Sequence, residues 1–139
     1  MSRFATALIV SERLHIPALV RMLLNQVGIV TALEAEDTTE AVALAERHQP
    51  DVLLFDLSTP ASSAGEAIGR LRQVRPNPTV LVIASQSVRD ASSIALKLGA
   101  VGYLEEKGST ADALRTLRET LDGLSMGISK GESENARGE

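Results

Sequence analysis

The stretch PDVLLFDLSTP, residues 50–60, decides the fold of this 139-residue chain. Its apolar run from Val52 to Phe55 predicts a strand that is buried on both faces of a sheet. Asp56 follows this run directly, and Pro60 marks the turn that comes next. Open α/β sheets place their chemistry at the carboxyl ends of their strands, so Asp56 is the first candidate for a functional residue. A capping or turn carboxylate is the alternative interpretation of Asp56.

Strand and helix patterns alternate on both sides of this stretch. Short apolar runs predict further strands at residues 5–10, 29–35, 80–84 and 102–104. Helical spacing predicts helices over residues 15–27, 41–47, 63–74, 90–98 and 110–124, with capping signals at residues 37–40, 63–66 and 109–112. Five strands that alternate with five helices through short connections imply an α/β fold, in which a doubly wound parallel sheet carries helices on both faces.

Length and composition indicate one domain, which we expect to span residues 1–126. From residue 127 the sequence is rich in Ser, Gly and Glu with almost no apolar residues, so residues 127–139 are predicted to be a disordered tail or linker. The chain is 44% hydrophobic and 23% charged, which is typical of a soluble globular protein. We expect a cytoplasmic location.

Several classes of function are excluded by what the sequence lacks. A net charge of -4 offers no basic surface for nucleic acid or an anionic membrane. The absence of cysteine excludes disulfides, thiolate metal sites and cysteine nucleophiles. No apolar run approaches the ~18 residues of a membrane span, and no glycine-rich phosphate loop is present. A hydrolase or nucleotide-dependent enzyme is therefore disfavoured.

A second informative stretch is GAVGYL, residues 99–104. Together with residues 50–60 it resembles the receiver domain of response regulators in two-component signalling, over roughly residues 4–125. The resemblance is nearest to the branch whose receivers precede a helix-turn-helix output domain. It implies a flavodoxin-like five-stranded sheet in the order 2-1-3-4-5 with five helices, and a phosphorylation-regulated switch that is not an enzyme. Tyr103 then matches the family's switch aromatic, although a half-buried tyrosine at a sheet edge fits the same pattern.

In such receivers a histidine kinase phosphorylates an aspartate, beside a magnesium ion held by an acidic pair after the first strand. The resemblance makes Asp56 the phosphoacceptor and gives the metal the side chains of Glu12 and Asp56 and the backbone carbonyl of Ser58. Ser11 stands where the other acid of the pair is expected. Glu12 and Asp56 are expected to hold magnesium weakly, or else to share a proton or accept bonds from backbone N–H groups.

The hydroxyl and the lysine that would contact the phosphoryl group fall on Ala84 and Glu106. Ser85 and Lys107 stand one residue further on. They replace these groups only through a bulge or a one-residue shift, because adjacent strand residues point to opposite faces. A second anion about 4 Å from a phosphoryl group costs roughly 4 kcal/mol at an effective dielectric of 20. We interpret Glu106 and Lys107 as solvated loop charges. His15 and His48 have no neighbour at metal-ligand or relay spacing, so surface or capping roles are expected for them.

We therefore interpret the chain as an atypical receiver with a degenerate acidic pocket around Asp56, and as the N-terminal part of a transcription regulator. Its expected partners are a histidine kinase or other regulatory protein and a second copy of the chain, with DNA bound only through a missing output domain. A magnesium-dependent phosphoacceptor and a phosphorylation-independent dimerisation adaptor are the alternatives. A phosphatase with Asp56 as nucleophile is disfavoured, because Ser58 stands where such enzymes carry a second aspartate.

Overall fold

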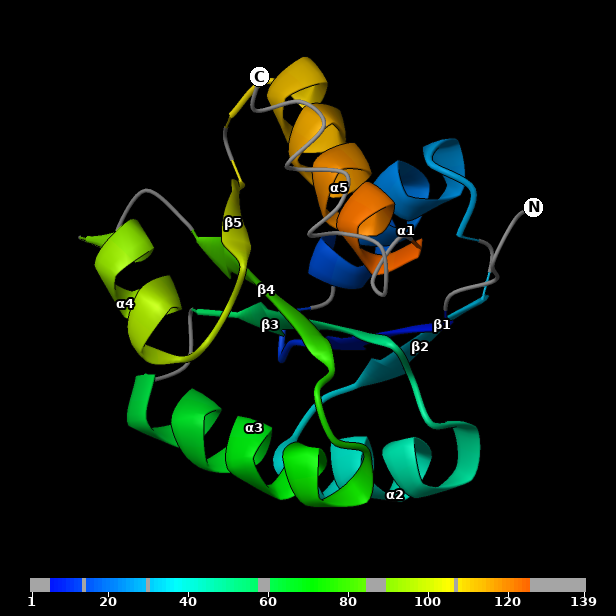
Figure 1. The fold of residues 1–139 in the computed structure, drawn as a ribbon, viewed down its shortest axis with the longest axis vertical. Helices are drawn as coiled ribbons and strands as arrows, with labels where there is room; N and C mark the ends of the chain where they lie inside the picture. The colour runs from blue at the N-terminus through cyan, green and yellow to red at the C-terminus, as the bar shows by residue number, and fades with distance from the viewer. Residues whose placement is uncertain are drawn as a thin grey trace, which may run out of the picture.

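Five parallel strands form the centre of the computed structural model (Figure 1). The strands are β1 (Thr6–Val10), β2 (Thr31–Ala35), β3 (Val52–Asp56), β4 (Thr79–Ala84) and β5 (Gly102–Glu105). They lie side by side in the order β2-β1-β3-β4-β5, and every neighbouring pair is parallel. Both the predicted doubly wound sheet and the strand order implied by the resemblance are confirmed.

The structure describes residues 6–13, 15–29, 31–57, 61–84, 90–106 and 108–125. Three candidate residues, Ser58, Ser85 and Lys107, fall outside these ranges, as does the predicted tail from residue 127. Their roles therefore stay predictions. Within the described ranges, no helix combines the length and the apolar character needed to cross a membrane.

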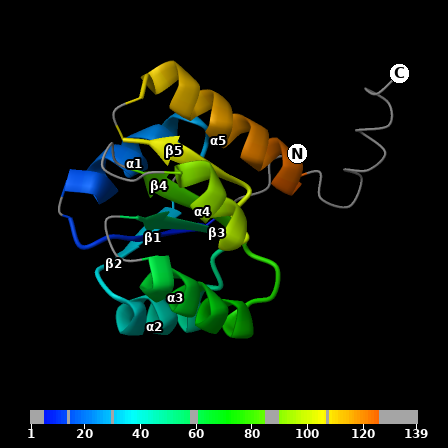
Figure 2. The same ribbon diagram turned by 90° about the vertical axis from the view of Figure 1, so that its left-hand side faces the viewer.

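Helices cover both faces of the sheet, as Figures 1 and 2 show. They are α1 (His15–Gln26), α2 (Thr38–His48), α3 (Ala61–Val74), α4 (Ala91–Lys97) and α5 (Thr110–Ser125). Helices α1 and α5 pack on one face, and α2 and α3 pack together on the other. The short α4 contributes Ala95 to the same hydrophobic cluster as α3.

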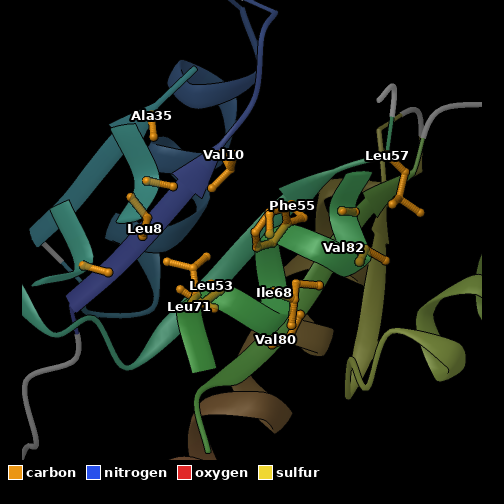
Figure 3. Close-up of a cluster of buried hydrophobic side chains, with 14 of the residues drawn as sticks. Leu8, Val10, Ala35, Leu53, Phe55, Leu57, Ile68, Leu71, Val80 and Val82 are labelled. Carbon is orange, nitrogen blue, oxygen red and sulfur yellow. The ribbon is translucent and has the colours of Figure 1, made fainter. Parts of the chain in front are cut away.

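The period of two in each strand divides the core into two hydrophobic clusters. On β1, Ala7 and Ile9 enter the cluster beneath α1 and α5, whereas Leu8 and Val10 enter the cluster beneath α2 and α3. Figure 3 shows the second cluster, in which the labelled residues are Leu8, Val10, Ala35, Leu53, Phe55, Leu57, Ile68, Leu71, Val80 and Val82. Because β3 is buried on both faces, its sequence is a continuous apolar run that ends at Asp56.

Two of the three predicted capping signals are confirmed. The Asp37 side chain accepts a hydrogen bond from the backbone N–H of Glu40 at 2.8 Å and caps α2. Ser109 Oγ accepts a bond from a backbone N–H in the first turn of α5 at 3.0 Å. The predicted cap at Ser63 is wrong, because α3 begins at Ala61 and the serine lies inside the first turn.

Candidate functional site

Asp56 ends β3 at the carboxyl edge of the sheet, and its residue is only 1% exposed. The sheet continues one residue past the neighbouring strand ends, since Leu57 N–H donates to Ile83 O at 2.9 Å and Glu106 N–H donates to Ala84 O at 2.8 Å. The end of β3 and the segments that follow β1 and β5 carry the side chains of the candidate site.

Arg13, in the loop after β1, binds the Asp56 carboxylate with two atoms of its guanidinium. Nη2 lies 2.6 Å from Oδ1, and Nε lies 2.8 Å from Oδ2. The Asp56 side chain is 0% exposed and that of Arg13 is 27% exposed, so the arginine covers the carboxylate. This two-point, charge-assisted geometry is the strongest form of side-chain hydrogen bonding in proteins.

Ser11 completes the contact on the same side of the carboxylate. Its Oγ donates to Asp56 Oδ2 at 2.6 Å and accepts the backbone N–H of Arg13 at 3.1 Å. Because Ser11 is itself only 5% exposed, this hydroxyl fixes the loop after β1 against Asp56. The residue that stands where an acid was expected is thus a direct hydrogen-bond donor to Asp56.

Glu106 holds the other side of the arginine. Arg13 Nη1 donates to Glu106 Oε1 at 2.9 Å, and His15 Nε2 lies 3.1 Å from Glu106 Oε2. The Glu106 side chain is 14% exposed. The interpretation of Glu106 as a solvated loop charge is therefore wrong, because two basic side chains bind its carboxylate. The guanidinium lies between two carboxylates and offsets the repulsion that they would otherwise exert on each other.

The ionisation of these groups follows from their contacts. The hydrogen bond to Asp56 is the largest cause that raises the pKa of Arg13 above its usual range; burial opposes it, and Glu106 adds to it. The pKa of Glu106 is lowered, first by the hydrogen bond from His15 and then by Arg13, again against burial. Both Arg13 and Glu106 therefore stay charged near neutral pH, and the cluster is ionic.

The remaining candidate residues lie as follows. Ala84 is buried at the end of β4, and Tyr103 is half-buried on β5 opposite Val82 and packs against the second cluster. A sheet-edge position for Tyr103 is thus observed, while its rotation as a switch stays a prediction. His15 and His48 are exposed, as expected.

The donors around Asp56 do not fit a magnesium ion. Magnesium requires oxygen ligands in a near-octahedral arrangement, and carboxylates are its usual protein ligands. Here both Asp56 oxygens accept bonds from a cationic guanidinium, Ser11 provides a hydroxyl donor in place of an acid, and the Glu12 residue is exposed. Among the residues that the structure describes, no group of three or more His, Asp or Glu side chains is arranged to hold a metal.

Arg13 is the residue of this site that sequence reasoning missed. It is separated from Asp56 by 43 residues and lies two positions after the residue that bonds Asp56. A signal for it was present, because the loss of an acid at Ser11 and the gain of one at Glu106 leave a place for a cation nearby. Taken together, these two changes point to the arginine.

The sequence matches a known family of domains. A family model described as response regulator receiver domain matches residues 7–118. The chain is 28% identical over 120 residues to the nitrate/nitrite response regulator protein NarL of Escherichia coli strain K12. The aligned region covers 86% of this chain and 56% of that protein. It is 34% identical over 101 residues to the transcriptional regulatory protein PdtaR of Mycobacterium tuberculosis, covering 70% of this chain and 49% of that protein.

The fold has close relatives among solved structures. The REC domain of AraT, a response regulator from Geobacillus stearothermophilus, superposes with a TM-score of 0.77 and 25% identity, covering 91% of this chain and 99% of that domain. The chain spans about half the length of the curated relatives described above, at 56% and 49%.

Proposed function

This chain belongs to the response-regulator receiver domain family, and on that premise we propose that it is an atypical receiver whose Asp56 pocket is closed by Arg13. In this proposal the domain signals through contacts with other proteins and does not depend on phosphorylation. The single observation that carries it is the two-point contact between the Arg13 guanidinium and the fully buried Asp56 carboxylate.

Phosphorylation requires one Asp56 oxygen to attack a phosphorus atom. Both oxygens accept hydrogen bonds from Arg13, and Oδ2 also accepts one from Ser11. Hydrogen bonds to charged groups are worth about 1.5–3 kcal/mol each, so exposing the carboxylate has a substantial free-energy cost. These contacts favour a stable, unphosphorylated domain.

The partners in this proposal follow from the family and from the length of the relatives. Because the chain spans about half of NarL and PdtaR, we propose that an output domain follows in the whole protein and binds DNA. A non-enzymatic role, a cytoplasmic location, and contacts with a histidine kinase or another regulatory protein belong to the same proposal. So does pairing with a second copy of the chain.

The test is phosphorylation by a small donor. The wild-type domain and the Asp56→Asn variant are incubated with phosphoramidate and magnesium, and intact masses are measured. We expect no difference in phosphoryl incorporation between them, while a receiver with the family's full acidic pair becomes phosphorylated in parallel. A phosphoryl adduct on the wild type that is lost in Asp56→Asn overturns the proposal and supports the phosphoacceptor alternative.

A further inference from the structure

We infer that the Arg13 guanidinium takes the place of the divalent metal ion in the Asp56 pocket, and that Arg13 and Ser11 together prevent such an ion from binding there. In the family the pocket is expected to hold a divalent ion between Asp56 and an acidic pair after β1. In this chain the guanidinium of Arg13 reaches Asp56 from that same loop. The inference deepens the proposed function and rests on it.

Two donors from the segment after β1 bind one oxygen of Asp56. Arg13 Nε and Ser11 Oγ lie 2.8 Å and 2.6 Å from Asp56 Oδ2. The residue at the acidic-pair position and the arginine therefore share one carboxylate oxygen. A divalent ion bound to that oxygen has to displace the guanidinium, and the hydroxyl at Ser11 adds no negative charge in exchange.

The positive charge of Arg13 is held by two carboxylates. Arg13 forms ion pairs with Asp56 at 2.6 Å and with Glu106 at 2.9 Å. A positive group between two carboxylates is favoured by both, whereas a divalent ion brought beside the guanidinium is repelled by it. Arg13 is thus held in place by the acid that stands where the family has a lysine.

These contacts join two departures from the pattern that the resemblance implies. The acid expected at Ser11 is absent, and an acid, Glu106, stands where a lysine is expected. Arg13 supplies Asp56 with a cation from the segment after β1 and also binds the carboxylate of Glu106, after β5. Relative to the implied pattern, an acid and a cation have exchanged places between these two segments.

The experiment is thermal unfolding, followed by circular dichroism, as magnesium chloride is added at constant ionic strength. It compares the wild type, Ser11→Asp, Arg13→Gln and the double variant Ser11→Asp/Arg13→Gln. We expect magnesium to raise the melting temperature only in the double variant, by about 5 °C at ten times its dissociation constant, and to raise it further with the logarithm of the magnesium concentration. Adding Asp56→Asn to the double variant should remove that rise.

Two results overturn the inference. One is a magnesium-dependent rise in the melting temperature of the wild type that Asp56→Asn abolishes. The other is a folded double variant that binds no magnesium or manganese by isothermal titration calorimetry. If the double variant does not fold, the wild-type titration still decides.

The two proposals fail separately. If Asp56 of the wild type becomes phosphorylated but the wild type does not bind magnesium, the proposed function is wrong and the inference about Arg13 stands. If the wild type binds magnesium at Asp56 but is not phosphorylated, only the inference is wrong.

Discussion

Arg13 Nη2 lies 2.6 Å from Oδ1 of Asp56, whose side chain is 0% exposed, so the guanidinium covers this carboxylate at the end of β3. A related ion pair lies on the surface, where Nε and Nη2 of Arg21 both donate to one oxygen, Oε2, of Glu34, and both side chains are 45% exposed. The two arginine–carboxylate pairs therefore differ mainly in burial, which makes the surface pair a control for the buried one.

Replacing Arg13 by alanine should strongly destabilise the domain. The substitution leaves a charged carboxylate in a buried site with a weaker set of partners, and breaking such a pair costs about 3 kcal/mol. Urea denaturation measures the loss. Arg21→Ala, the matched control, should cost under about 1 kcal/mol because solvent screens the exposed pair. Equal losses in the two variants would mean that Arg13 contributes no more than a surface pair.

Ser11→Ala tests the remaining donor to Asp56. The variant removes the 2.6 Å hydrogen bond from the hydroxyl and also the acceptor of the Arg13 backbone N–H. We expect a loss of about 1–2 kcal/mol in the free energy of unfolding. Ser93→Ala, on the exposed face of α4, serves as the control and should change stability little. A loss in Ser11→Ala no larger than in the control would contradict the structural role of the hydroxyl.

Much of this arrangement was predictable from the sequence, because its signals are local. The apolar runs of β1 and β3 follow from burial on both faces of the sheet, and the Asp37 cap follows from side-chain chemistry within one turn. The Arg13 contact was missed for the opposite reason. No local pattern specifies the direction of a long side chain in a loop, and its partners lie 43 and 93 residues away.

Stability should depend on Glu106 at acid pH. Its pKa is lower in the folded protein than in the unfolded chain, so the unfolded chain binds more protons as the pH falls. The stabilisation is complete above the ordinary glutamate pKa of about 4.3 and is lost as the pH falls through the folded-state pKa. Melting temperatures measured across this range should fall less steeply in Glu106→Gln than in the wild type. Glu46→Gln, an exposed control on α2, should keep the wild-type slope.

Moving the positive charge back to the segment after β5 should partly rescue the loss of Arg13. In Arg13→Ala/Glu106→Lys, the lysine replaces an acid whose own cation has been removed, and it supplies Asp56 with a cation from the position that the family uses. We expect the double variant to be about 1 kcal/mol more stable than Arg13→Ala in urea denaturation.

The control for this rescue is Arg13→Ala/Glu105→Lys, which changes charge by the same amount one residue earlier. Glu105 is exposed, and adjacent strand residues point to opposite faces of the sheet, so a lysine there is directed away from Asp56. Rescue by Glu106→Lys alone indicates a local ion pair with Asp56. Equal rescue by both substitutions would show that net charge is responsible, and the absence of rescue by either would contradict the exchange of charges between the two loops.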